Sequence, residues 1–130
     1  MREVIEKDLK HIDLMLHYIG RISENIKRFS ELNINLNDEM VIENLSFLLS
    51  QIGEQLANDK LSSVTKEKYP AVEWRKIKGL RNLVAHSYTS VNSSTILEII
   101  QVNIPTLEDG LKDVRNDLIK QIQIAEDGLN

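Results

Sequence analysis

Apolar residues recur along the first part of the chain at steps of three, four and seven positions. This spacing places them on one face of a helix, because an α-helix turns once every 3.6 residues or so. The pattern predicts one long amphipathic helix over residues 4–32, about 40 Å in length. Its apolar positions are Ile5, Leu9, Ile12, Leu16, Ile19, Ile26 and Phe29.

A second, wider apolar stripe covers residues 39–58, after a polar loop at 33–38. Either Asn37 or Asp38 is suited to cap the start of this helix. The width of the stripe indicates that the helix contacts more than one neighbour. The apolar positions of the stripe are Val41, Ile42, Leu45, Leu48, Leu49, Ile52 and Leu56.

The second half of the chain is punctuated by Pro70 and Pro105, and no strand pattern stands out. Pro70 ends a connection over residues 59–70, because proline disfavours helix in the residue before it. Pro105 suits the first turn of a helix. The later elements are expected to be a third helix over 72–86, a loop over 87–94, a fourth helix over 95–103 and a fifth over 105–125. The predicted fold class is all-α, an antiparallel bundle of four to five helices in one domain over residues 1–130.

The composition is that of an ordinary globular domain, with 42% hydrophobic and 28% charged residues in 130. Cysteine is absent, which excludes disulfides and thiolate zinc sites. The charged amino terminus does not resemble a signal peptide, and no apolar run of about 18 residues could span a membrane. We therefore expect a cytoplasmic protein that does not enter a membrane.

The net charge of −4 argues against a general nucleic-acid binder, but the charges are unevenly spread. Residues 66–81 hold six basic side chains against Glu67 and Glu73, a local charge of +4 that leaves −8 elsewhere. Two interpretations stay open, a solvated helix face or an anion-binding patch. The basic side chains are Lys66, Lys68, Arg75, Lys76, Lys78 and Arg81.

Three histidines are the remaining candidates for chemistry. His11 and His17 are six positions apart, about 120° around a helix, so they do not converge on one metal ion. Asp13 and His17 share a face, but two ligands are a weak metal signal. We expect both helix-one histidines to be solvated surface residues, and we expect no metal site.

The third histidine, His86, has different surroundings. Arg81, Asn82, His86 and Tyr88 fall within eight residues at the end of the third predicted helix. One interpretation is structural, since cations are favoured at a helix C-terminus and Tyr88 can pack its ring. The other is a catalytic site.

The residues Arg81-Asn82-x-x-x-His86-x-Tyr88 resemble the Arg-x4-His-x-Tyr motif of HepT-like toxins in the HEPN superfamily. The resemblance continues outside the motif and covers residues 8 to about 115. Gln55 departs from the family, which usually has alanine there, and residues 95–98 lack an aromatic residue often found at that place. The flanking similarities are Asp8-Leu9-x-x-Ile12, Ile52-Gly53-Glu54, the run 70–80 with Trp74 and Gly79-Leu80, and Ile104-Pro105-x-Leu107.

The resemblance implies an endoribonuclease toxin that cleaves RNA without a metal or other cofactor. The RNA supplies its own 2′-hydroxyl nucleophile, His86 would transfer protons, and Arg81 would bind phosphate oxygens. Asn82 would orient the ring or bind the ribose. Two interpretations of Glu54 stay open, a buried polar residue that braces the motif helix or a surface residue. The RNA approach would be lined by Lys66, Lys68, Arg75, Lys76 and Lys78.

The resemblance also implies two kinds of partner. A minimal nucleotidyltransferase antitoxin of the MntA type would transfer AMP to Tyr88 and so repel RNA. A second copy of the chain would supply the second proton-transfer group, with the first helix and the stripe of the second helix as candidate dimer surfaces. The alternatives are a non-catalytic substrate- or nucleotide-binding subunit of such a nucleotidyltransferase, or a bundle used only for assembly.

Overall fold

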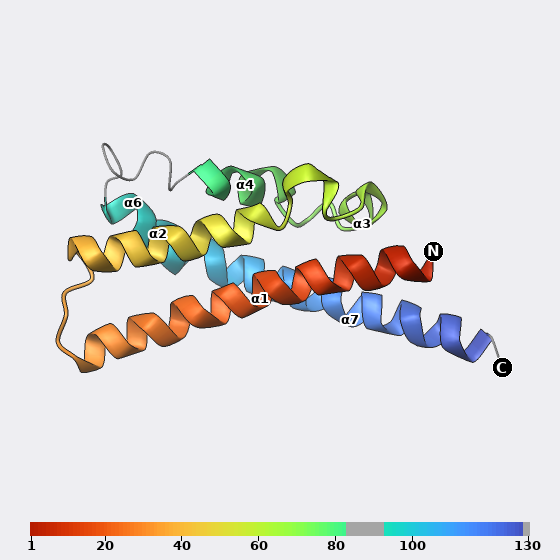
Figure 1. The fold of residues 1–130 in the computed structure, drawn as a ribbon, viewed down its shortest axis with the longest axis horizontal. Coiled ribbons are helices and arrows are strands. Elements are labelled where there is room, and N and C mark those ends of the chain that lie inside the picture. Colours follow the sequence, from red (N-terminus) through yellow and green to blue (C-terminus); the bar gives the residue numbers. More distant parts are fainter. Residues whose placement is uncertain (83–92, 129–130) are drawn as a thin grey trace.

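The computed structural model describes residues 1–82 and 93–128, and all of its regular elements are helical (Figure 1). The prediction of an all-α fold is confirmed, because these residues contain no strand. In chain order the elements are α1 (Arg2–Glu31), α2 (Glu39–Glu54), η1 (Ala57–Asp59), α3 (Ser63–Lys68), α4 (Trp74–Gly79), η2 (Leu80–Asn82), α6 (Ser93–Glu98), η3 (Ile99–Asn103) and α7 (Ile104–Gly128).

The long helices α1 and α7 run antiparallel, so that both chain ends lie at the same end of the molecule (Figure 1). Two surface ion pairs join them. Arg2 Nη2 lies 2.6 Å from Glu126 Oε1, and Arg115 Nε lies 2.7 Å from Asp13 Oδ1. Of the apolar face predicted for the first helix, Ile12 and Ile19 are almost fully buried in the core, and Met15 and Ile22, which the prediction did not include, are buried beside them.

Helix α2 contacts α1, α4, η2 and α6, which confirms the prediction made from its wide stripe. Its apolar stripe is therefore used within the chain, and the expectation that this stripe forms a dimer surface was wrong. The large hydrophobic side chains that α2 leaves exposed are Met40 and Phe47. The stripe is buried because the short helices α4 and α6 cover the side of α2 that α1 does not reach.

The start of α2 is as predicted and its end is not. Asp38 caps the helix, with Oδ1 accepting a hydrogen bond of 2.9 Å from the Met40 amide. The helix ends at Glu54 rather than at residue 58, and Asn58 and Asp59 follow with φ angles of 52° and 56°. These are left-handed conformations that asparagine and aspartate tolerate better than other residues. Leu56 stays buried although it has left the helix.

The predicted connection over residues 59–70 contains the short helix α3. Ser62 caps it, and Asp8 of α1 accepts hydrogen bonds from the Ser62 amide at 2.9 Å and from the Thr65 hydroxyl at 2.6 Å. Asp8 is 1% exposed, so this cluster is part of the core. Sequence analysis missed α3 because the carboxylate that stabilises its first turn comes from a distant helix.

The fourth and fifth predicted helices form one continuous helical segment. Helix α6 begins at Ser93, two residues before the predicted start, and leads through the π-helical residues of η3 into α7. Pro105 lies in the first turn of α7, as expected. Proline is tolerated in the first turn of a helix, where its missing amide hydrogen would have no partner within that helix, and the π-helical residues of η3 run into this turn without a break.

Within residues 1–82 and 93–128, no helix combines the length and the apolar character needed to cross a lipid bilayer.

Candidate functional site

The site is built where α2 and η2 approach each other at Gly53. A Cβ atom on Gly53 would lie 2.6 Å from the backbone nitrogen of Arg81 and 2.8 Å from the carbonyl oxygen of Ile77. Such distances are not compatible with any larger residue, so glycine permits this contact. The contact places Arg81 beside Glu54, the residue that follows Gly53.

Glu54 is shared between two cations. Its Oε2 lies 2.8 Å from Arg81 Nε, and its Oε1 lies 3.0 Å from Lys60 Nζ. The side chains of Arg81, Glu54 and Lys60 are 47%, 32% and 32% exposed, respectively, so the cluster lies at the surface. Two cations around one carboxylate leave a net charge of +1 on this triad, which we call the Lys60–Glu54–Arg81 triad.

The triad favours the ionised form of Glu54. The hydrogen bond from Lys60 lowers the pKa of the Glu54 carboxyl below its usual value, and the positive charge of Arg81 acts in the same direction. Partial desolvation opposes them. Glu54 was expected either to brace the motif helix as a buried residue or to lie at the surface; its side chain is partly exposed and pairs with Arg81. The geometry adds Lys60, which sequence analysis did not single out.

Helix α4 is held in place by Trp74 at its start. The Trp74 indole Nε1 donates to the carbonyl oxygens of Lys66 at 3.1 Å and Tyr69 at 3.0 Å. The Tyr69 hydroxyl in turn donates to Asp117 of α7, and burial together with that carboxylate raises the pKa of the phenol. These bonds connect α3, α4 and α7, and they position η2 at the end of α4.

The predicted third helix is less regular than expected over the residues that the structure describes. It begins at Trp74 rather than at residue 72, and its α-helical part ends at Gly79. The 3₁₀ turn η2 then carries Arg81 and the exposed Asn82. His86 and Tyr88 lie outside the described residues, so the approach of Arg81 to His86 stays a prediction.

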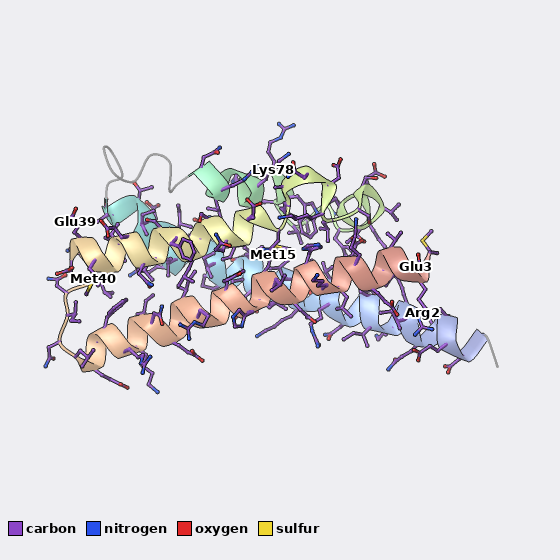
Figure 2. All side chains as sticks on the ribbon, in the orientation of Figure 1. Arg2, Glu3, Met15, Glu39, Met40 and Lys78 are labelled. Carbon is purple, nitrogen blue, oxygen red and sulfur yellow. The ribbon has the colours of Figure 1, made fainter. Side chains whose placement is uncertain are left out.

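The predicted basic patch divides into two groups. Lys76 Nζ lies 2.5 Å from Glu73, and Lys68 Nζ lies 3.8 Å from Asp117, so acidic neighbours offset both of them. Arg75 and Lys78 have no acidic partner among residues 1–82 and 93–128, and Lys78 points away from the molecule (Figure 2). Lys66 is partly buried on α3. The local charge of +4 counted from sequence is thus partly neutralised in the fold.

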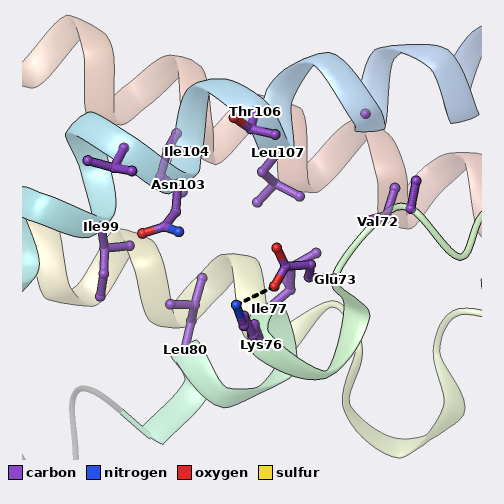
Figure 3. A pocket seen from close by; sticks show the side chains of 13 residues that line it. Val72, Glu73, Lys76, Ile77, Leu80, Ile99, Asn103, Ile104, Thr106 and Leu107 are labelled. Carbon is purple, nitrogen blue, oxygen red and sulfur yellow. Dashed lines mark ion pairs between the residues drawn. The ribbon is translucent and has the colours of Figure 1, made fainter.

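An apolar groove of about 630 Å³ lies between α4–η2 and η3–α7 (Figure 3). Leu80 lines this groove, whereas the adjacent Arg81 does not and instead pairs with Glu54. Consecutive residues of η2 therefore serve two different surfaces. The other apolar side chains lining the groove are Ala71, Val72, Ile77, Ile99, Val102, Ile104 and Leu107.

The helix-one histidines are not equivalent. His17 is exposed as expected, but His11 is partly buried, and its Nδ1 lies 2.9 Å from Gln55 Oε1. Gln55 Nε2 donates to the Gln51 carbonyl, which orients Oε1 toward His11. The expectation that His11 is a solvated surface residue was wrong, because Gln55, which stands where the family usually has alanine, covers it. No group of three potential metal ligands occurs within the described part of the chain.

Comparisons with known proteins agree with the family resemblance. Residues 2–114 match the profile of the family described as ribonuclease HepT-like. A protein of Caldanaerobacter subterraneus subsp. tengcongensis, provisionally named an RNase, is 38% identical over 66 residues, which cover 51% of this chain and 57% of that protein. Two proteins of Methanocaldococcus jannaschii with the same provisional name are 27% and 30% identical, over 56% and 54% of this chain and 65% and 59% of their own lengths.

The chain thus spans about three fifths of the length of these curated relatives, between 57% and 65%. No solved structure matches it. The family profile, in contrast, covers nearly the whole chain and includes Glu54, Arg81 and the motif that follows. The resemblance inferred from the motif is confirmed at the level of the family, and this chain belongs to the ribonuclease HepT-like family.

Proposed function

We propose that this protein is a metal-independent endoribonuclease that acts as the toxin of a toxin–antitoxin pair, with Arg81, Asn82 and His86 as its catalytic residues. The observation that carries the proposal is the position of Arg81 in a surface cluster of net positive charge, held through Nε by Glu54 at 2.8 Å. A guanidinium held in this way can bind two oxygens of one phosphate. Membership of a ribonuclease family supports RNA as the phosphate source.

The proposed reaction begins with the 2′-hydroxyl of RNA. A base removes its proton, the 2′-oxygen attacks the adjacent phosphorus, and the bond from phosphorus to the 5′-oxygen breaks as that oxygen takes up a proton. The products are a 2′,3′-cyclic phosphate and a 5′-hydroxyl. His86 transfers protons at neutral pH, and Arg81 stabilises the additional negative charge of the phosphorane. Asn82 orients the His86 ring or binds the ribose.

One motif histidine per chain supplies one of the two proton-transfer groups. We therefore propose a homodimer in which two copies of the motif face one cleft. The large hydrophobic side chains that α2 leaves exposed are Met40 and Phe47. A second copy of the chain can cover the face of α2 that carries them. Sedimentation at micromolar concentration tests this part of the proposal, and a protein that stays monomeric together with full activity contradicts it.

The proposed path for RNA follows α4 toward η2. Arg75 and Lys78 lie exposed on this path without acidic partners among the described residues, so they are the strongest phosphate contacts of the predicted set. Lys66, Lys68 and Lys76 contribute less, since two of them are offset by Asp117 and Glu73.

The proposed regulation of the toxin is a covalent modification. A partner nucleotidyltransferase of the MntA type transfers AMP from a nucleoside triphosphate to the Tyr88 hydroxyl, with release of pyrophosphate. The added phosphate brings negative charge and bulk next to the catalytic residues, which repels RNA. The resemblance of the Arg81–Tyr88 motif to that of HepT-like toxins supports this choice of partner.

Expression in bacteria without the partner tests the enzymatic function. We expect growth arrest and RNA cleavage with the wild-type chain, and neither with Arg81→Ala or His86→Ala. Lys112→Met is a matched control, because Lys112 lies on α7 in a surface pair with Glu108 at 3.7 Å. If the wild-type chain is harmless and leaves RNA intact, the alternative of a non-catalytic nucleotidyltransferase subunit replaces the enzymatic proposal.

A further inference from the structure

We propose that Lys60 is a positioning residue of this site: through Glu54 it holds the Arg81 guanidinium so that the two terminal nitrogens face a substrate phosphate. The inference rests on the proposed function and adds a residue that lies outside the Arg81–Tyr88 motif. It is carried by the contacts, the charge balance and the backbone turn of the Lys60–Glu54–Arg81 triad.

Lys60 makes two contacts with the same residue. Its Nζ donates to the Glu54 carbonyl oxygen at 3.2 Å and to Glu54 Oε1 at 3.0 Å. The first contact places a cation at the C-terminal end of α2, where the helix dipole favours it. The second contact restrains the rotation of the Glu54 carboxylate.

The backbone conformation just before Lys60 brings this residue back to the end of α2. Asn58 and Asp59 have φ angles of 52° and 56°, and this pair of left-handed residues turns the chain back toward the end of α2. Left-handed conformations are unfavourable for residues other than glycine and recur at functional sites. Without this turn, the chain would carry Lys60 away from Glu54.

The two oxygens of Glu54 are divided between the two cations. With Oε1 held by Lys60, Oε2 is fixed 2.8 Å from Arg81 Nε. Nε is the nitrogen nearest the side-chain stem, so an anchor there leaves the far end of the guanidinium, with Nη1 and Nη2, as the part that can reach phosphate. That end presents the planar fork that matches two phosphate oxygens.

The charge balance gives Lys60 a second role. Arg81 paired with Glu54 alone is neutral, and a neutral pair attracts phosphate weakly. Lys60 restores a net charge of +1 to the triad while it leaves Arg81 oriented. Lys60 is also the main reason that the pKa of Glu54 is lowered, so it favours the ionised form that anchors Arg81.

Variants at Lys60 separate charge from packing. Lys60→Met removes the charge and keeps most of the stem, whereas Lys60→Arg keeps the charge. Lys112→Met removes a surface lysine of α7 that pairs with Glu108 at 3.7 Å. Circular dichroism and thermal unfolding check that each variant is folded, and Lys60→Arg keeps the proposal testable if Lys60→Met unfolds.

The first measurement does not need RNA cleavage. Nuclear magnetic resonance of the Arg81 Nε–Hε group, assigned with Arg81→Lys, reports how firmly the guanidinium is held. We expect a signal that is protected from solvent exchange in the wild type, Lys60→Arg and Lys112→Met, and lost in Lys60→Met. An all-2′-deoxy oligonucleotide, which cannot be cleaved, should bind Lys60→Met about tenfold more weakly than the wild type.

The second measurement is cleavage of a single-stranded RNA. Lys60→Met should lower kcat/KM about tenfold, and Lys60→Arg should stay within about threefold of the wild type. Glu54→Gln should lower kcat without raising KM, because it releases Arg81 but adds net positive charge. The double variant Glu54→Gln/Lys60→Met should have no lower kcat than Glu54→Gln, since Lys60 orients Arg81 through Glu54.

The two measurements distinguish failure of the inference from failure of the proposed function. If the wild type cleaves RNA and Lys60→Met matches Lys112→Met in both measurements, Lys60 is not a positioning residue. If the wild type does not cleave RNA, the ribonuclease proposal fails, and the Arg81 signal with the oligonucleotide titration still decides the role of Lys60. An unchanged signal and unchanged binding in Lys60→Met overturn the inference in that case as well.

Discussion

The carboxylate of Asp8 on α1 accepts a hydrogen bond of 2.6 Å from the hydroxyl of Thr65 on α3, across 57 positions of sequence. Asp8 is 1% exposed and Thr65 is 6% exposed, so this hydrogen bond is shielded from solvent. The same carboxylate binds Ser62, the cap of α3. This cluster connects the longest helix to the short helices that position Arg81.

Asp8→Ala should destabilise the fold by about 1–3 kcal/mol, because the buried hydroxyl of Thr65 and the partly buried donors of Ser62 lose their acceptor. Urea denaturation measures the free energy of unfolding. Asp13→Ala is the control, since Asp13 is a surface carboxylate on the same helix that pairs with Arg115. Its loss should cost under about 1 kcal/mol. Equal losses in the two variants would show that the Asp8 cluster adds little to stability.

Gly53→Ala should lower both stability and activity, because the new Cβ would lie 2.6 Å from the Arg81 nitrogen and must displace η2. We expect a loss of about 1–3 kcal/mol in thermal or urea unfolding. Gly20→Ala on α1 is the matched control, since nothing lies within 4 Å of the added Cβ. Alanine should stabilise that helix by up to about 1 kcal/mol. The prediction is wrong if both alanine variants are stabilised.

The ion pairs of Glu54 should make stability depend on pH in the acidic range. The pKa of Glu54 is lowered in the folded state from its usual 4.5, so its contribution is fully present above pH 4.5 and is lost as the pH falls through the lowered value. The difference in unfolding free energy between wild type and Glu54→Gln should therefore shrink on acidification. Lys60→Met should raise the Glu54 pKa, measured by carbon NMR of the carboxyl. A difference that grows toward low pH contradicts this sign.

Lys78→Ala should weaken binding of single-stranded RNA more than Lys76→Ala does. Lys78 has no acidic partner among the described residues, whereas Lys76 lies 2.5 Å from Glu73 and loses that pair when it binds phosphate. The slope of log affinity against log salt should fall by about 0.7 for Lys78→Ala and by less for Lys76→Ala. The catalytically inactive His86→Ala background keeps the RNA intact during the titration. Equal effects would mean that the Glu73 pair does not influence binding.

Tyr88→Phe should stay toxic but escape inhibition by the partner nucleotidyltransferase. Co-expression with the partner nucleotidyltransferase should add the mass of one AMP to the wild-type chain and none to Tyr88→Phe, measured by intact-mass spectrometry. Cells that express the partner should then grow with the wild type and arrest with the variant. Modification of the variant at Tyr18 or Tyr69 would assign the acceptor role to another phenol.

Much of the fold follows from local patterns in the sequence. The stripe of Ile12 and Ile19 needs only the period of the helix to predict α1, and the side chain of Asp38 caps α2 through its own neighbouring backbone. The Arg81–Tyr88 motif and the segment around Gly53-Glu54 also identify the family without any structure. Each of these signals is contained in a short stretch of consecutive sequence, which is the range over which periodicity and capping act.

Only the tertiary structure decides what depends on partners distant in sequence. Helix α3 forms over residues predicted as a connection because Asp8 of α1 holds its first turn, and His11 is covered because Gln55 reaches it from just after the end of α2. The site follows the same rule. Arg81 and Glu54 occur in the motif and in a recognised segment, but Lys60 joins them only because two left-handed residues turn the chain back after α2. Long-range packing and charge pairing determine these contacts, and neither produces a periodic pattern in the sequence.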